Sequence, residues 1–387
     1  MPHQRVKTFL IVGKLTPDGL TPVYGLEDTN HFGHALSTFL IAKKQIVKTV
    51  NSNYTYSERK NQPIISKTDD IDSFCIAKVT LDKLDTLPPT RSDELFWTLK
   101  QLVKMRTSIT DTNIEYKNKL HAQLFHHYPN YTEFFHYFDC KTALTMWETY
   151  PSPDILLQQT TAKAFADLLY KISNNAIRRE KGHAIYNMVQ QYDTEQMDFQ
   201  PERNYLIKSL VRHIKYNNNQ LSILDEEISA IMERIGYKLD TFIGLDKVSA
   251  AQIVSEVGNI NRFHSADSLA KYAGIAPVEF SSGGKATTKH NKYDNRQLNS
   301  YIYMLACRHL SCGRNKDNPV SPIFLEYYNK KVSEGKTKKQ AINYIMRRII
   351  RILYGMMKTG MEYQHPEKLS DECIERFRKE LAENEPP

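Results

Sequence analysis

The chain has 387 residues, which is enough for two or three domains. Hydrophobic residues make up 41% and charged residues 25% of the sequence, so the composition excludes an intrinsically disordered chain. No stretch approaches the ~18 consecutive apolar residues of a membrane span, and five scattered cysteines do not suit a disulfide framework. We therefore expect a cytoplasmic protein without membrane contact. The net charge of +8 does not by itself indicate nucleic-acid binding, because its distribution matters more.

The first 90 residues have the mixed pattern of an α/β domain. Short apolar runs alternate with helical spacing and polar segments. The expected elements are a strand at Leu20–Leu26 that ends at Glu27, a helix at His34–Ala42, a strand at Ile46–Val50, a polar loop at Asn51–Ser66 that carries Arg59 and Lys60, and a helix that starts near Thr68.

The middle of the chain, residues 91–236, reads as helical. Pro88-Pro89 within Asp85–Asp93 marks a candidate domain boundary. Two long helical patterns follow, at Glu94–His127 and Tyr205–Ile235, and we expect them to pack as an antiparallel hairpin or coiled coil. The last part, residues 237–387, differs because it is rich in glycine and basic residues.

Two aspartates stand three residues apart in the segment Lys67-Thr-Asp69-Asp70-Ile-Asp72. If a helix starts at Thr68, Asp69 and Asp72 lie on one face, one turn apart. A divalent cation would relieve their repulsion, and Mg²⁺ prefers such hard oxygen ligands. Glu27, at a strand end, could join them. The alternative is a solvated helix N-terminus, where acidic residues stabilise the helix dipole.

The segment Ile243–Gly258 has the look of a helix-hairpin-helix motif. Gly244 would lie in a tight turn, and backbone N–H groups from about Ser249 could hold a DNA phosphate. A simple helical turn in a protein core is an equally open interpretation.

A loop with two serines follows, at Ser281-Ser282-Gly283-Gly284. A serine hydroxyl can attack a phosphodiester if its proton is removed and the charge on the phosphate is offset. Basic residues that could offset this charge come directly afterwards: Lys285, Lys289, Lys292 and Arg296. Without further information, an ordinary surface loop explains the same residues.

The segment Ala341–Met357 predicts an amphipathic helix, with Ile345, Ile349 and Leu353 on its apolar stripe. Arginines lie mostly away from that stripe: Arg347, Arg348 and Arg351. A solvated charged face is the usual explanation. The scarcity of acidic residues between Tyr327 and Gly360 favours phosphate contact.

Three blocks of the sequence resemble the DEDD-type insertion-sequence transposases of the IS110 class, which are bridge-RNA-guided DNA recombinases. The first is Tyr24-Gly-Leu-Glu27-Asp-Thr-Asn-His-Phe-Gly and the second is Lys67-Thr-Asp69-x-x-Asp72. The most specific block runs from Ile243 to Ala306 and includes Glu256-Val-Gly258, Tyr272-Ala-Gly274, Ser282-Gly283 and Asn295-Arg296. The resemblance covers nearly the whole chain.

The resemblance implies an α/β RNase H/RuvC-like domain at residues 1–90, a helical coiled-coil segment at 91–236 and a mainly α transposase domain at 237–387. Glu27, Asp69 and Asp72 would be catalytic ligands of Mg²⁺, and Ser282 would attack DNA to form a phosphoserine link. The implied partners are double-stranded DNA, a non-coding guide (bridge) RNA, and further copies of the chain in a dimer or tetramer. A bacterial, nucleoid-associated protein would follow.

The sequence departs from the family pattern at its beginning. The family's first acidic residue lies in an opening strand of the type Gly-Ile-Asp, whereas no Asp or Glu precedes Asp18 here. Asp18 lies in a Thr-Pro-Asp-Gly turn signal. We therefore expect the first strand of the domain and its ligand to be missing, through a late start codon or through decay of the element, and a truncated copy of this kind could be inactive.

Two other functions remain open at this point. A nuclease of the RNase H type or a junction resolvase would need only the carboxylates. A non-catalytic remnant could still bind DNA through its basic C-terminal half. A covalent protein–DNA adduct would distinguish the transposase from both.

Overall fold

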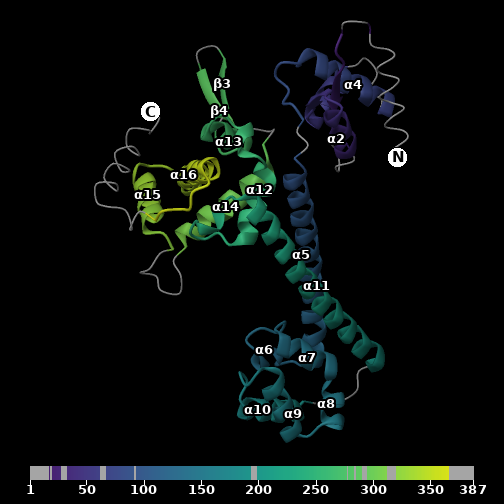
Figure 1. Ribbon diagram of the computed structural model, residues 1–387. Coiled ribbons are helices and arrows are strands. Elements are labelled where there is room, and N and C mark those ends of the chain that lie inside the picture. Colours follow the sequence, from purple (N-terminus) through teal and green to yellow (C-terminus); the bar gives the residue numbers. More distant parts are fainter. Residues whose placement is uncertain are drawn as a thin grey trace. The chain divides into compact units, whose positions relative to one another are not determined.

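The computed structural model describes residues 17, 20–27, 33–61, 67–90, 93–192, 198–276, 278–282, 285–289, 294–311 and 320–365 (Figure 1). The contacts divide the chain into two compact units: residues 1–98 with 237–387, and residues 99–236. The predicted division at residues 90 and 236 into three domains stays a prediction. Several sequence expectations lie outside the described residues: the missing opening strand, the turn at Asp18, the loop glycines Gly283 and Gly284, and Lys292.

The N-terminal part contains a two-stranded parallel sheet, as expected for an α/β domain. Strand β1 (Val23–Leu26) pairs with β2 (Ile46–Thr49), from Val23 opposite Ile46 to Leu26 opposite Thr49. Helix α2 (His34–Ala42) connects them, because parallel strands need a crossover. The two strands and the helix confirm the elements predicted from the sequence. The family's RuvC-like fold has a larger sheet, and that larger sheet stays a proposal.

Residues 51–66 were predicted as a loop, and for 52–60 this was wrong. They form helix α3 (Ser52–Lys60), which packs against α4 (Asp69–Asp82). The side chain of Asn51 caps α3 by accepting the N–H of Asn53 at 2.9 Å. Thr55 is its one buried residue, so the sequence has no apolar stripe from which the helix could be predicted. Tertiary packing on α4 and the cap outweigh the polar sequence.

Helix α4 begins where the sequence predicted. Thr68 is its N-cap and accepts the N–H of Ile71 at 3.3 Å. The helix lies close to β1 at Gly25, where a Cβ atom would stand 1.9 Å from Oγ1 of Thr80. A glycine is therefore required at position 25 for this approach.

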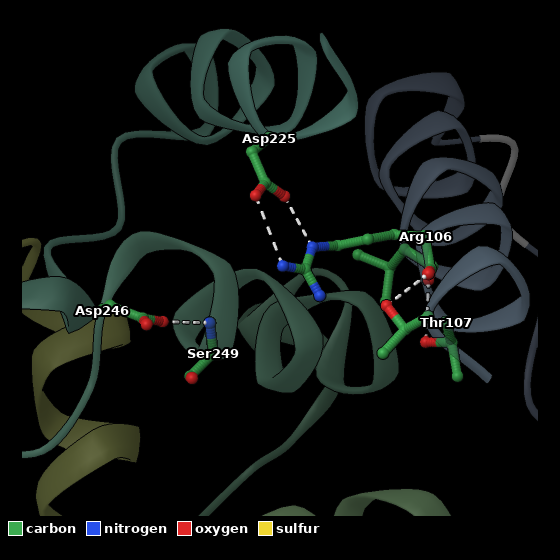
Figure 2. A network of polar contacts seen from close by, with 7 residues as sticks. Arg106, Thr107, Asp225, Asp246 and Ser249 are labelled. Carbon is green, nitrogen blue, oxygen red and sulfur yellow. Dashed lines mark hydrogen bonds and ion pairs between the residues drawn. The ribbon is translucent and has the colours of Figure 1, made fainter. Parts of the chain in front are cut away.

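The two predicted long helices form an antiparallel pair. They are α5 (Glu94–His127) and α11 (Gln200–Ile235). Arg106 binds Asp225 through two hydrogen bonds of 2.5 and 3.3 Å, which Figure 2 shows, and Asn113 donates to Asn218 at 2.8 Å. Seven residues separate these contacts on each helix, in opposite directions. The two helices therefore run antiparallel where these contacts form, and the two polar contacts fix how one helix is aligned against the other.

A small helical bundle lies between these two helices in the sequence. It comprises α6 (Tyr131–Phe134), α7 (Lys141–Thr149), α8 (Pro153–Gln159), α9 (Ala162–Ile172) and α10 (Arg179–Gln190). Its core surrounds Trp147, which is fully buried and donates its indole N–H to the carbonyl of Phe138 at 2.9 Å.

The C-terminal part is mainly helical, as expected, with a β-hairpin in addition. Its elements are η1 (Leu239–Thr241), α12 (Lys247–Val257), η2 (Ile260–Arg262), α13 (Ala266–Tyr272), β3 (Val278–Ser282), β4 (Lys285–Lys289), α14 (Arg296–Leu310), α15 (Pro322–Ser333) and α16 (Lys338–Thr359). Helix α16 packs against α13, α14 and α15. The predicted apolar stripe is confirmed, since Ile345, Ile349 and Leu353 are buried.

The base of the β3–β4 hairpin is tied together by Asn295, the N-cap of α14. Its Nδ2 donates to Oε2 of Glu256 at 2.7 Å and to the hydroxyl of Tyr272 at 3.0 Å. Its Oδ1 accepts the N–H of Leu298 at 2.9 Å. One amide thus joins α12, α13 and α14 at the positions where the chain leaves for the hairpin and returns from it.

A substitution that removes only the donors of this amide tests the network. Asn295→Asp keeps the capping oxygen but places a second carboxylate against Glu256. We expect it to destabilise the C-terminal part by about 2 kcal/mol at neutral pH, because a partly buried hydrogen bond becomes a repulsive contact. Calorimetric thermal unfolding measures the effect.

The control is Asn259→Asp, since the Asn259 side-chain oxygen accepts the N–H of Asn261 at 3.0 Å and an aspartate keeps that role. If both variants unfold at the same temperature, the network contributes nothing beyond the cap.

His309, near the end of α14, is buried against the first turn of α15. The ring of His309, on α14, is 1% exposed and lies against the rings of Phe242 and Phe324, at centroid distances of 5.0 and 4.8 Å. Within the described part of the chain neither ring nitrogen has a hydrogen-bond partner of ordinary geometry, although the backbone of Ile243 lies near enough to oppose part of the effect of burial. Burial among apolar groups lowers the pKa of His309 from 6.5 to about 4. The folded protein therefore holds this ring neutral.

The stability of the C-terminal part should consequently fall on acidification. Below pH 6.5 the unfolded chain protonates this histidine while the folded chain does not, until the pH reaches about 4. Across this window we expect a loss of up to about 3 kcal/mol. His309→Leu should remove most of that loss, whereas His136→Leu, at an exposed position, should leave it intact. An unchanged pH dependence in His309→Leu would contradict this assignment.

Candidate catalytic and DNA-binding residues

The three predicted metal ligands come from β1 and α4. Glu27 directly follows β1 and is half-buried, while Asp69 and Asp72 lie in the first turn of α4, as the sequence indicated. Asp69 is exposed and Asp72 is half-buried. Since α4 packs on β1, the same pair of elements carries all three carboxylates.

Asp72 already has a cationic partner. Its Oδ1 accepts a hydrogen bond from Nη1 of Arg59, on α3. Among the residues whose positions are described, no three His, Cys, Asp or Glu side chains are grouped so that they could hold a metal ion. The convergence of Glu27, Asp69 and Asp72 on one ion therefore stays a prediction. Arg59 as a partner was missed, because the loop predicted for its segment gave it no fixed position.

The residues present nevertheless suit a divalent cation chemically. All three candidate ligands are carboxylates, the oxygen donors that Mg²⁺ prefers. The guanidinium of Arg59 at Asp72 shows that this carboxylate faces a cation within the fold. Glu27, Asp69 and Asp72 are the residues that would hold the ion.

The predicted serine loop is instead largely strand. Ser281 and Ser282 are the last two residues of β3, and Ser282 pairs with Lys285, the first residue of β4, across two intervening glycines in the sequence. The interpretation as a loop was wrong for both serines. The antiparallel pairing with Lys285 fixes the backbone of Ser282 at the end of β3.

The basic residues predicted to bind DNA differ in their surroundings. Lys285 and Lys289 are the two ends of β4, and Arg296 is exposed in the first turn of α14.

The arginines of α16 differ among themselves. The guanidinium of Arg348 stacks on the ring of Tyr327, 3.5 Å from its centroid, and Arg351 pairs with Asp267 at 3.4 Å. Arg347 is half-exposed. Arg348 and Arg351 therefore each have a partner within the chain, and phosphate contact by the arginines of α16 stays a prediction.

In the segment Ile243–Gly258 the tight turn at Gly244 is present, but the Ser249 N–H that was expected to hold a phosphate already has a partner. Gly244 adopts a left-handed conformation with a φ of +85°, as a tight turn requires. Arg308 donates to its carbonyl at 2.7 Å. The N–H of Ser249, offered as a phosphate donor, is bound by the carboxylate of Asp246 at 2.7 Å (Figure 2). A side-chain cap thus satisfies the N–H of Ser249, one of the backbone donors in the first turn of α12.

No helix in the described ranges is both long and apolar enough to span a membrane. Two family models match the chain. A model of DEDD transposases of the IS110 type matches residues 2–129, and a model described as "Transposase IS116/IS110/IS902 family" matches residues 236–321. The first range includes Glu27, Asp69 and Asp72, and the second includes Ser282.

Similar proteins come from insertion elements and from a gene-inversion system. A 44.8 kDa protein of insertion element IS116 from Streptomyces clavuligerus is 25% identical over 76% of this chain and 71% of its own length. A 43.6 kDa protein of insertion element IS110 from Streptomyces coelicolor is 30% identical over 41% of this chain, and the match spans only 38% of that relative. A pilin gene-inverting protein from Moraxella lacunata is 28% identical over 39% of this chain and 47% of its own length.

The two family models lie in the order of the sequence blocks that first suggested the resemblance, and together they cover more than half of the chain. They confirm that resemblance, and the family is one of enzymes. The chain belongs to the IS110 class of DEDD transposases.

Proposed function

We propose that this chain is the transposase of an insertion sequence, a recombinase that cuts and rejoins double-stranded DNA. The observation that supports this proposal most strongly is that one chain contains both a group of carboxylates and a candidate nucleophilic serine. Glu27 directly follows β1 and Asp69 and Asp72 lie in α4, while in the β3–β4 hairpin Ser282 is the register partner of Lys285. A carboxylate site alone would suit a nuclease, whereas a nucleophilic serine allows the cut DNA end to be conserved and rejoined.

In this proposal the hydroxyl of Ser282 attacks a DNA phosphorus. The Ser Oγ–P bond forms as the P–O bond to the leaving deoxyribose oxygen breaks. The serine proton is lost to a base, and the leaving oxygen takes up a proton. Lys285 and Arg296 offset the negative charge that builds on the phosphate. A bound Mg²⁺ would supply further charge neutralisation at the carboxylates.

The rejoining step reverses this chemistry. The hydroxyl of another DNA end attacks the phosphoserine phosphorus, and the Ser282 Oγ–P bond breaks. No external energy source is needed, because the number of phosphodiester bonds is conserved. We further propose, from the family resemblance, that a guide RNA selects the DNA and that the chain acts as a dimer or tetramer.

The identity of the nucleophile is tested by two neighbouring substitutions. We expect Ser282→Ala to abolish a covalent protein–DNA adduct on DNA from the element's ends, with the guide RNA present, while DNA binding stays nearly intact. Ser281→Ala should retain the adduct, because Ser282 and not Ser281 directly precedes Gly283, which lets the DNA backbone approach closely. Denaturing gels with labelled DNA measure the adduct.

Reversed effects would assign the role to Ser281. Strand cleavage by the wild type without any adduct would indicate a nuclease or resolvase that uses the carboxylates alone. DNA binding with neither cleavage nor adduct would indicate a non-catalytic DNA-binding protein.

The phosphate contacts are tested by comparing two adjacent arginines on α16. If Arg347 contacts a phosphate, Arg347→Ala should weaken DNA binding and reduce the slope of log K against log salt by about 0.9. Arg348→Ala should leave that slope unchanged, because its guanidinium is stacked on Tyr327, and should instead lower thermal stability. An identical slope in Arg347→Ala and the wild type would remove Arg347 from the DNA interface.

A further inference from the structure

Helices α3 and α4 are joined by two ion pairs of opposite polarity. Arg59 of α3 binds Asp72 of α4, and Glu58 of α3 accepts Nζ of Lys78 of α4 at 2.7 Å. Both pairs join the same two helices, but they differ in exposure and in whether their carboxylate is a candidate metal ligand. Lys78 is 44% exposed and its partner is no candidate ligand, whereas Arg59 is 15% exposed and binds one of the proposed metal-binding carboxylates.

Simultaneous binding of a guanidinium and a divalent cation to Asp72 would be unfavourable in free energy. The bond from Arg59 occupies Oδ1 of Asp72, one of the two oxygens on which a metal would bind. A dication coordinated by the same carboxylate would lie within a few ångströms of the guanidinium. Two positive charges at such a distance repel, and their partial burial weakens the screening by water.

We propose that Arg59 is a built-in competitor for the metal site: it neutralises Asp72 until a divalent cation displaces its guanidinium. This inference rests on the proposed role of Asp72 as a metal ligand. It adds that metal binding and release of Arg59 are one coupled event, so that Arg59 is a positioning residue rather than a ligand.

A second partner for the released side chain lies on its own helix. The guanidinium carbon of Arg59 is 5.6 Å from the centroid of the Tyr56 ring, and that tyrosine is 49% exposed. A guanidinium over an aromatic face is stabilised by the cation–π interaction. Arg59 can therefore leave Asp72 and keep contact with Tyr56, a ring that also lies 4.6 Å from Nζ of Lys60.

The inference is tested by Mn²⁺ titration of the full chain, followed by calorimetry. Arg59→Gln removes the competitor, so Mn²⁺ should bind roughly tenfold more tightly, the factor that corresponds to about 1.4 kcal/mol. Arg59→Lys keeps a cation and should stay near the wild type. Lys78→Gln removes one positive charge from the same two helices and should change the affinity much less than Arg59→Gln.

A double variant separates this mechanism from a general change in charge. In the Asp72→Asn background, Arg59→Gln should bring no gain in Mn²⁺ affinity. A gain that persists there, or an equal gain in Lys78→Gln, would overturn the role of Arg59. Weaker binding by Arg59→Gln would overturn it too, since Arg59 would then hold Asp72 in place for the ion. If Asp72→Asn alone leaves Mn²⁺ binding unchanged, the proposed metal ligand is wrong, which is a separate failure.

A measurement on the unaltered protein keeps the test independent of how the variants fold. The side-chain Nε–H signal of Arg59 should shift when Mg²⁺ is titrated into the ¹⁵N-labelled full chain. The corresponding signal of Arg106, whose Nε–H donates to Asp225, should not move and serves as the reference. A stationary Arg59 signal at saturating Mg²⁺ would contradict displacement.

Discussion

The close packing of α4 on β1 is the constraint on which the candidate catalytic site depends. Gly25 permits it, because any side chain at this strand position would collide with Thr80 of the helix. The strand ends at Leu26, Glu27 follows directly, and the first turn of the helix carries Asp69 and Asp72. Gly25 thus allows β1 and α4 to pack together, and these two neighbouring elements come from the two sequence blocks that contain the carboxylates.

The same packing explains why α3 matters to the site. A polar helix with one buried residue gains little from its own core contacts, and its ion pairs with α4 replace them. One of these pairs neutralises Asp72. The interaction that helps hold α3 in place is therefore also one that a metal ion would have to disturb, which links the stability of this helix to the proposed chemistry.

The sequence predicts elements well where periodicity is strong and poorly where tertiary contacts decide. The helices at His34–Ala42 and Glu94–His127 and the start of α4 at its Thr68 cap were all predicted, because apolar spacing and capping residues are local signals. Helix α3 was missed because its sequence is polar, and the strand at Ser281-Ser282 because neighbouring glycines suggested a loop.

For the candidate site, the sequence and the resemblance supplied the residues but not their partners. Neither the Arg59–Asp72 pair nor the Asp246 cap on Ser249 follows from a motif, since each depends on how side chains meet in the folded chain.

The central claim is that carboxylates of β1 and α4 form one divalent-cation site. Crystals of the full chain grown with Mn²⁺ test it most directly, through the anomalous scattering of the ion. We predict an anomalous peak within coordination distance, about 2.1 Å, of carboxylate oxygens of both Glu27 and Asp72, with the Arg59 guanidinium moved off Asp72. A structure in which Mn²⁺ binds elsewhere while Arg59 still holds Asp72 would contradict it.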